Sequence, residues 1–160
     1  MTRAERKGEG TIQVDIRYVV RRAGNRRVKI YAKYGVPERA GRVPGIMVFF
    51  EAGNPFDEVF VKRFVRRGYG VLCVDYCGDN GTDLHTVYPP AVDYANYVRA
   101  GSHLNKAEPT ARETSWYEWA GVARHAATLL ATREEVTHYG ATGLGTGGGT
   151  ILHLPPSVKH

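Results

Sequence analysis

Long apolar runs, a leader-like N-terminus and clustered cysteines are all missing from this 160-residue sequence. No apolar stretch approaches the roughly 20 residues that a membrane-spanning helix needs, so no membrane association is expected. The opening residues, MTRAERKGEGT, contain basic side chains but no apolar segment, which argues against a secretory signal. The two cysteines, Cys73 and Cys77, are too few for a disulfide framework or a zinc finger, and are typical of reduced thiols in a cytoplasmic protein.

Metal ligands at the spacings of known sites are missing as well. No histidine has a second ligand at helical or finger spacing, so surface or packing roles are expected for all six: His85, His103, His125, His138, His153 and His160. The sequence therefore predicts no metal and no other cofactor.

Positive charge is concentrated in one part of the chain. The net charge is +6: residues 1–44 carry 12 basic against 4 acidic residues, or +8, and the remainder carries 10 against 12, or −2. A basic surface can attract nucleic acid or an acidic partner. In residues 17–34, however, the charges alternate with Val, Ile and Tyr as on a solvated hairpin, and no base-stacking module accompanies them. Nucleic-acid binding is therefore not expected.

Apolar residues alternate with polar ones in two early segments. Residues 12–20 and 28–34 both have period two, and residues 23–25 between them have the composition of a turn, which predicts a β-hairpin. Residues 1–11 precede this pattern and are expected to form a flexible N-terminus.

A strand, a helix and a second strand are predicted next. The continuous apolar run at 46–50 is typical of a parallel strand covered on both faces, and residues 69–75 are expected to form the second strand. Between them, Asn54 is a good N-cap, Pro55 suits the first helical position and Gly68 favours a helix end.

The last third of the chain continues this alternation. Residues 76–109 form a long excursion without clear periodicity, and Thr110 to Glu113 read as a capping box. Residues 136–144 predict a third parallel strand. The helix between them is expected to pack one face on the sheet, formed by Trp116, Ala120, Ala123, Ala127 and Leu130. We therefore predict a single α/β domain over residues 1–160, in which the N-terminal hairpin is followed by a partial, doubly wound, mostly parallel sheet with helices on both faces.

A glycine cluster follows the last predicted strand, and two kinds of site use such a loop. Gly143, Gly145 and Gly148 match the dinucleotide-binding pattern G-x-G-x-x-G. The stretch Gly143 to Gly147 also matches the strand-to-helix turn of serine hydrolases, G-x-S-x-G, with glycine in place of serine. The dinucleotide interpretation fits poorly, because it needs an acidic residue about 20 positions further on and none follows this loop.

Four phrases resemble the α/β-hydrolase fold, and more narrowly the acetyl xylan esterases, cephalosporin deacetylases and dienelactone hydrolases. They are VPGIMVFFEAGN, RRGYGVLCVDYCG, ETSWYEWAGVARHAATLL and YGATGLGTGGG, the last standing where the family has its nucleophile elbow. The resemblance covers residues 12–149 and only the N-terminal part of the family. It implies a serine ester hydrolase acting on a small ester or carbohydrate-like ligand.

The resemblance also assigns roles to particular positions. Gly145 occupies the position of the nucleophile, Thr146 would supply one backbone N–H to the oxyanion, and Ala52 or Gly53 would supply the other. Glu51 lies in the same loop, where a carboxylate would repel a developing oxyanion. The family nucleophile is therefore missing.

The end of the sequence departs from the family as well. The family's acid and histidine lie on later strands, whereas this chain ends eleven residues after Gly149. Pro155 and Pro156 are expected to prevent the helix that should follow the elbow, so residues 150–160 form an atypical tail. We therefore expect a truncated, inactive relative of carboxylic-ester hydrolases. The alternatives are a non-catalytic module that binds a small molecule or a protein, and a frame-shifted product.

Two further expectations concern binding surfaces. Asp75, Trp116 and Trp119 are candidates to line a pocket with Glu51, although Asp75 could instead close a turn and the tryptophans could pack in the core. Residues 136–144 form an edge strand if no further strand follows, so self-association through this segment is expected.

Overall fold

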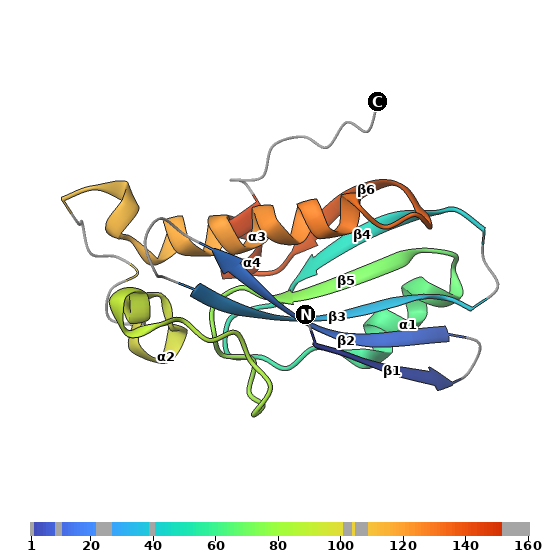
Figure 1. Cartoon of the computed structure of the whole chain (residues 1–160), viewed down its shortest axis with the longest axis horizontal. Helices are drawn as coiled ribbons and strands as arrows, with labels where there is room; N and C mark the ends of the chain where they lie inside the picture. The colour runs from blue at the N-terminus through green and yellow to red at the C-terminus, as the bar shows by residue number, and fades with distance from the viewer. Residues whose placement is uncertain are drawn as a thin grey trace.

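The computed structural model describes residues 2–8, 11–21, 27–38, 41–100, 104 and 109–151. Six strands form one sheet with the order β1-β2-β3-β5-β4-β6 (Figure 1). They are β1 (Thr2–Gly8), β2 (Thr11–Arg21), β3 (Arg27–Pro37), β4 (Val43–Phe49), β5 (Gly70–Asp75) and β6 (Val136–Gly143). The helices are α1 (Glu58–Arg66), α2 (Tyr97–Ala100), α3 (Ser115–Ala131) and α4 (Thr146–Ile151), with 3₁₀ turns η1 at Pro90–Ala95 and η2 at Ala111–Glu113.

The sheet combines an antiparallel part and a parallel part. β2 and β3 form the predicted hairpin, and β3 pairs antiparallel with β5. β4 is parallel to β5 on one side and to β6 on the other, as predicted for the three later strands. The α/β fold class is therefore confirmed.

The N-terminal strand β1 was not expected. Residues 1–11 were predicted to be flexible, but Thr2 to Gly8 pair antiparallel with β2, with Thr2 opposite Arg17. The segment TRAERKG has no apolar alternation, so backbone hydrogen bonding to the edge of β2 forms the strand. Composition gives no signal for such a strand.

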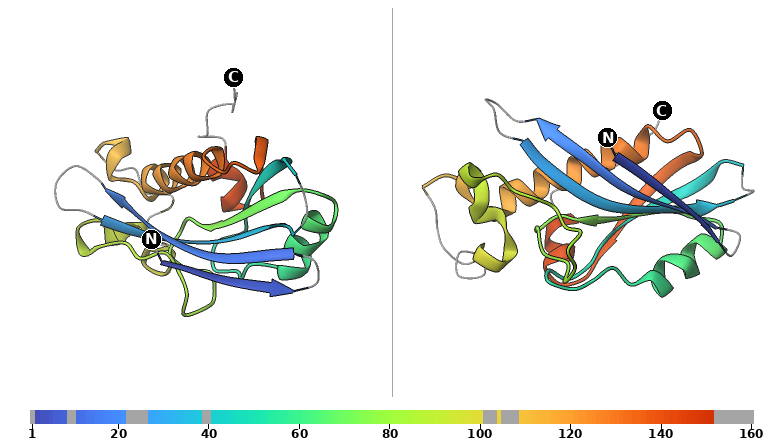
Figure 2. Two further views of the ribbon diagram at one scale, coloured as in Figure 1. Left: turned by 45° about the vertical axis from the view of Figure 1, so that its right-hand side comes forward. Right: turned by 60° about the horizontal axis from the view of Figure 1, so that its bottom comes forward.

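Helices cover both faces of the sheet, and Figure 2 shows α1 and α3 on opposite sides of it. Because side chains alternate along a strand, the fully buried β5 contributes to both layers. Leu72 and Val74 pack toward α3, while Val71 and Cys73 pack toward α1. Among the described residues, no helix combines the length and the apolar composition needed to cross a membrane.

Helix α1 begins later than predicted. Asp57 is its N-cap, with Oδ1 accepting the N–H groups of Val59 at 2.9 Å and Phe60 at 3.1 Å. Asn54 instead forms a turn in which its N–H donates to the carbonyl of Glu51 at 3.2 Å. Asn and Asp are N-caps of similar strength, so the difference is positional: Asp57 accepts two N–H groups of the first helical turn. The predicted end is confirmed, since Gly68 has φ +89° just after the helix.

Helix α3 also begins one turn later than predicted. The hydroxyl of Thr110 donates to the carboxylate of Glu113 at 2.9 Å, and these residues form the 3₁₀ turn η2 rather than a capping box. The N-cap is Thr114, whose hydroxyl accepts the N–H of Tyr117 at 3.2 Å. The buried face of α3 differs in part from the predicted one. Trp116 and Ala120 are only half-buried, and the fully buried apolar residues are Trp119, Val122, Ala123, Ala126, Ala127 and Leu130.

The long excursion is anchored to the sheet. Val87 exchanges backbone hydrogen bonds with Lys29 of β3 at 2.8 and 3.0 Å. One residue earlier, the hydroxyl of Thr86 accepts the N–H of Tyr31 at 2.9 Å. The described part of the excursion therefore packs as part of the domain along β3.

Candidate functional site

The glycine cluster forms a tight strand-to-helix turn. β6 ends at Gly143, Gly145 has φ +53°, and α4 begins at Thr146. The N–H of Leu144 donates to the carbonyl of Phe49 on β4 at 3.1 Å, which fixes the end of the strand. This φ value lies in the left-handed region, which glycine adopts without steric cost. The tip of the turn therefore favours glycine.

A helix follows this turn, contrary to the prediction that prolines would prevent it. α4 spans Thr146–Ile151 and ends before Pro155 and Pro156, which lie outside the described residues. A proline disturbs its own turn and the residue before it, so prolines four and five positions downstream leave these six residues free to form a helix.

Two glycines of the cluster are required by close packing. A Cβ on Gly143 would lie 2.7 Å from the carbonyl carbon of Gly147, and a Cβ on Gly147 would lie 2.4 Å from the carbonyl oxygen of Phe49. A Cβ on Gly148 would meet nothing closer than 3.4 Å. Close packing therefore requires glycine at 143 and 147, the first and last positions of the elbow pattern. Gly148, the third glycine of the dinucleotide pattern, has room for a side chain.

The Glu51 carboxylate lies in this turn. Glu51 follows β4, and its Oε2 accepts the N–H of Thr146 at 3.2 Å while its Oε1 accepts the Thr146 hydroxyl at 2.9 Å. A Cβ built on Gly145 would stand only 1.3 Å from Oε2. The carboxylate therefore fills the space that a side chain at the tip would occupy.

The backbone groups predicted to bind an oxyanion are all engaged inside the chain. The N–H of Thr146 binds Glu51, and the N–H of Ala52 donates to the Thr146 hydroxyl at 3.2 Å. Gly53, with φ +79°, donates to the carbonyl of Asp79 at 3.0 Å. The structure thus brings Glu51, Ala52 and Thr146 together, while Gly53 serves the neighbouring loop.

The Thr146 hydroxyl is the centre of a small polar network. Its oxygen lies 2.6 Å from the Tyr76 hydroxyl, which also donates to the carbonyl of Phe50 at 3.1 Å. The Tyr76 hydroxyl and the Thr146 hydroxyl each have one proton, and either can be the donor in their mutual contact. The Thr146 oxygen therefore joins the loop after β4, through Glu51 and Ala52, to Tyr76.

Tyr76 was not singled out by sequence reasoning. It directly follows the buried strand β5, and the carboxyl end of such a strand is where ligand sites of open α/β sheets gather. That position was the only available signal. Burial raises the pKa of the Tyr76 hydroxyl above its ordinary value, so this hydroxyl stays protonated at neutral pH.

Asp75 closes a turn. Its Oδ1 accepts the N–H groups of Cys77 at 3.2 Å and Gly78 at 3.0 Å, and its Oδ2 accepts that of Thr86 at 2.7 Å. Burial raises the pKa of Asp75, opposed by these hydrogen bonds. The carboxylate is fully used in holding the start of the excursion on β5.

The two tryptophans form an aromatic row with Tyr76. The Trp119 ring lies 5.4 Å from that of Tyr76 and 5.1 Å from that of Trp116, both edge to face. Trp119 is completely buried, and its Nε1 donates to the carbonyl of Ala95 in the excursion at 2.8 Å. Trp116 lies against α4, where a Cβ on Gly149 would be 3.0 Å from its ring. The row packs α3, α4 and the excursion together.

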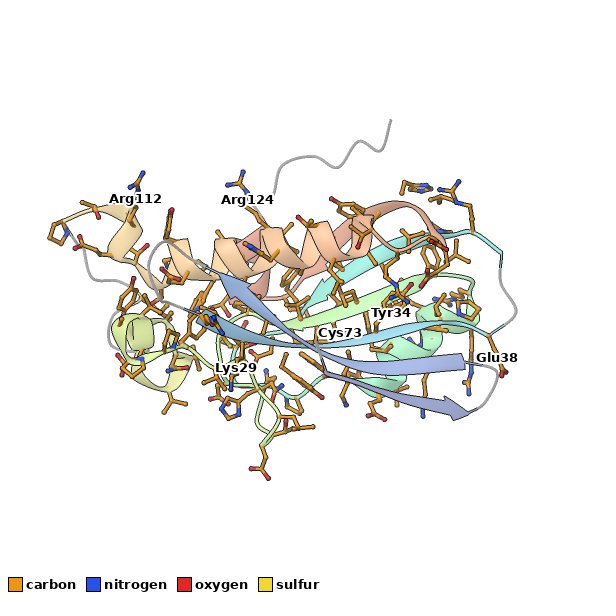
Figure 3. All side chains as sticks on the ribbon, in the orientation of Figure 1. Lys29, Tyr34, Glu38, Cys73, Arg112 and Arg124 are labelled. Atoms are coloured by element: carbon orange, nitrogen blue, oxygen red, sulfur yellow. The ribbon has the colours of Figure 1, made fainter. Side chains whose placement is uncertain are left out.

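A second polar cluster lies at the opposite end of β6. The Tyr34 hydroxyl (labelled in Figure 3) donates to Oε1 of Glu135 at 3.0 Å, and Arg133 forms an ion pair with the same carboxylate at 2.8 Å. The Arg133 guanidinium also lies 4.8 Å from the centre of the Tyr34 ring. The cluster joins β3 to the residue that precedes β6. No group of three potential metal ligands occurs among the described residues.

Comparison with known proteins finds similarity in solved structures only. No protein-family model and no curated protein sequence matches the chain. Acetyl xylan esterase 1 from Thermoanaerobacterium sp. JW/SL YS485 is similar with a TM-score of 0.69 and 18% identity, over 95% of this chain and 47% of that one. The acetyl xylan esterase from Paenibacillus sp. R4 gives 0.64 and 15%, over 95% and 48%. An S-formylglutathione hydrolase from Agrobacterium tumefaciens gives 0.60 and 15%, over 95% and 56%.

These similarities concern the fold. The chain has an α/β fold of the α/β-hydrolase type, shared with esterases and with a dienelactone hydrolase-like phosphotriesterase. It spans about half the length of these structures.

Proposed function

We propose that this chain is an esterase-type scaffold whose elbow does not perform serine-dependent ester hydrolysis. The observation that carries the proposal is the pair formed by Gly145 and Glu51: the tip has no side chain, and a carboxylate oxygen stands 1.3 Å from where its Cβ would be. Residue 145 has no hydroxyl to attack an ester, and the Glu51 carboxylate lies where its side chain would be.

Electrostatics supports the same conclusion. Ester hydrolysis develops a negative charge on the carbonyl oxygen, and losing one donor to that oxygen costs about 3–4 kcal/mol of transition-state stabilisation. Here Thr146 and Ala52 both donate to internal acceptors. An oxyanion about 4 Å from the Glu51 carboxylate would in addition be opposed by about 4 kcal/mol at an effective dielectric of about 20.

The test compares ester hydrolysis and serine labelling in four proteins: wild type, G145S, E51A and the double variant G145S/E51A. We expect wild type to hydrolyse p-nitrophenyl acetate no faster than a catalytically inert protein of similar size, and to remain unlabelled by a fluorophosphonate. The double variant should label faster than G145S, because removing the Glu51 carboxylate frees the space for the new side chain. Wild-type turnover, or fluorophosphonate labelling of a native serine, contradicts the proposal.

A purely ligand-binding elbow is less well supported. The donors of the elbow and the aromatic row are engaged in internal contacts among the described residues. Binding of a small ester or carbohydrate-like ligand stays a prediction of the sequence.

A further inference from the structure

One face of the sheet is covered only in part. Helix α1 packs on β3 and β5. β4 and β6 come next in the sheet order, and the helices that pack most closely on them among the described residues are α3, on the opposite face (Figure 2), and α4, which packs against α3. Parallel strands are ordinarily covered on both faces. The α1 side of β4 and β6 therefore lacks the cover that such strands favour.

The strand register identifies the residues on this surface. Ile46 and Val48 of β4 belong to the apolar layer under α1, and they pair with Gly140 and Thr142 of β6. Because paired residues of neighbouring strands point to the same face, Gly140 and Thr142 lie on the α1 side as well. Gly140 is exposed, and a Cβ on it would meet none of the described residues within 4 Å. The space above this part of β6 is therefore open.

Aromatic rings border the open surface on the side of α1. The Phe60 ring of α1 lies 5.8 Å from that of Phe50, which directly follows β4, and 4.7 Å from that of Phe64. All three rings and Ile46 are half-buried, so each keeps apolar surface exposed. These residues form one surface, called here the open strip, which consists of Ile46, Phe50, Phe60, Phe64, Gly140 and Thr142.

The open strip has the width of one helix. Neighbouring strands lie about 4.8 Å apart, and an α-helix with its side chains is about 10 Å across. Since α1 occupies the space over β3 and β5, the two remaining strands β4 and β6 leave room for one more helix beside it. The small side chains at positions 140 and 142 allow such a helix to approach the sheet closely.

Unpaired positive charge borders the same strip. Arg63 and Arg67 are exposed, and each follows one of the two phenylalanines of the strip in α1 by three residues, which places them on the same side of the helix. Neither arginine forms an ion pair with a described residue. Toward β3, by contrast, Glu58 of α1 pairs with Lys33 at 3.0 Å. The charge that remains unneutralised therefore lies beside the open strip.

We propose that the open strip binds an acidic amphipathic helix of a partner protein. Aliphatic side chains of that helix would cover Ile46 and the phenylalanine rings, and its carboxylates would lie beside Arg63 and Arg67. A second copy of this chain fits less well, because its net charge of +6 and its own two arginines would oppose those of the first. Residues 152–160 of the chain itself contain two prolines and no acidic residue. The pairing proposed for the edge of β6 uses backbone groups and not this face.

The probe is a fluorescein-labelled peptide of about 18 residues, five helical turns, with leucine at positions i, i+3, i+4 and i+7 and glutamate elsewhere. Its binding to the wild-type chain is followed by fluorescence polarisation at physiological ionic strength. We expect saturable binding. A peptide with lysine in place of glutamate, and one with the leucines distributed around the whole helix, should each bind at least about fivefold more weakly.

Two pairs of variants place the binding on the strip. R63E/R67E should weaken the acidic peptide at least about fivefold and improve binding of the lysine peptide. R112E/R124E changes the net charge equally on the side of α3, where both arginines are exposed (Figure 3), and should leave the affinity within about twofold.

The second pair uses neighbouring residues of β6 that point to opposite faces. G140E places a carboxylate in the open space of the strip and should weaken the acidic peptide, whereas A141E places it on the other face and should not. Cooperative thermal unfolding of each variant shows that it is folded. Equal effects of the two variants in either pair overturn the inference.

Failure of the acidic peptide to bind also overturns it, and two measurements then identify the other possible occupants. Sedimentation that differs between wild type and R63E/R67E assigns the strip to a second copy. Binding of wild type, but not of R63E/R67E, to phosphatidylserine vesicles assigns it to a membrane surface. None of these results bears on the elbow, so the proposed function stands or falls separately.

Discussion

Replacement of Gly147 by alanine tests whether the elbow is packed as tightly as the structure indicates. A Cβ on this residue would lie 2.4 Å from the carbonyl oxygen of Phe49 and 2.8 Å from that of Phe50. Both contacts are with backbone atoms of β4 and the residue after it, which cannot move aside as a flexible side chain can. α4 would have to shift away from the sheet.

The expected cost follows from two opposing effects. Overpacking against backbone costs about 3 kcal/mol at the upper end of the usual range. Alanine in place of glycine inside a helix returns about 1 kcal/mol. The net loss of about 2 kcal/mol lowers the Tm of a domain of this size by about 4–8 °C.

G148A is the matched control, one residue further along the same helix. Its Cβ would meet nothing closer than 3.4 Å, so helix propensity alone should apply and stability should rise by up to about 1 kcal/mol. Thermal and urea unfolding followed by circular dichroism measure both variants. If G147A and G148A unfold at the same temperature, the close approach of α4 to Phe49 is not part of the cooperative fold, and the elbow geometry derived from it is wrong.

Two other predictions concern β6 and the residue before it. We propose that this strand pairs with a second copy of the chain, since in the described part it pairs with β4 alone and contains no acidic residue, Lys, Arg or Pro to oppose edge pairing. A141K should then reduce concentration-dependent association in analytical ultracentrifugation, and a wild type that stays monomeric at all concentrations refutes the pairing. Just before β6, burial disfavours the charged form of the Glu135 carboxyl and by itself would raise its pKa. Hydrogen bonds, including those from Arg133 and Tyr34, outweigh burial, so the pKa of Glu135 in the folded chain lies below its ordinary value of 4.5. This carboxylate therefore stabilises the fold above its ordinary pKa and loses that contribution as pH falls through the lower folded value. E135Q should flatten the acid side of the stability profile by up to about 1 kcal/mol, and an identical acid profile contradicts the assignment.

Most of the sheet could be predicted from the sequence because its signals are local. The alternation of residues 12–20 and 28–34 and the apolar runs at 46–50 and 69–75 each occupy a few consecutive residues, and the strands form there. Strand β1 was missed because its pairing depends on backbone groups of β2, and its own side chains have no apolar pattern.

Helix starts were less predictable because several residues compete for the same role. Asn54 and Asp57 are both good N-caps, as are Thr110 and Thr114, and in each pair the later residue caps the helix. The hydroxyl of Thr110 donates to the carboxylate of Glu113 and accepts no capping N–H, whereas the hydroxyl of Thr114 accepts the N–H of Tyr117. Such competition is decided by tertiary packing, which shifts the buried face of α3 to Trp119.

The candidate site was predictable residue by residue but not in its arrangement. The sequence indicates that Gly145 replaces a nucleophile and that Glu51 lies in the facing loop, as two separate departures from the family pattern. In the structure they are one feature, because Oε2 of Glu51 occupies the space that only a glycine at 145 leaves open. The contact joins residues almost a hundred positions apart, and no periodicity or motif spacing reports on it. A side chain at 145 therefore has to displace the flexible Glu51 carboxylate from its two hydrogen bonds to Thr146, which predicts that the effects of G145S and E51A on stability are non-additive.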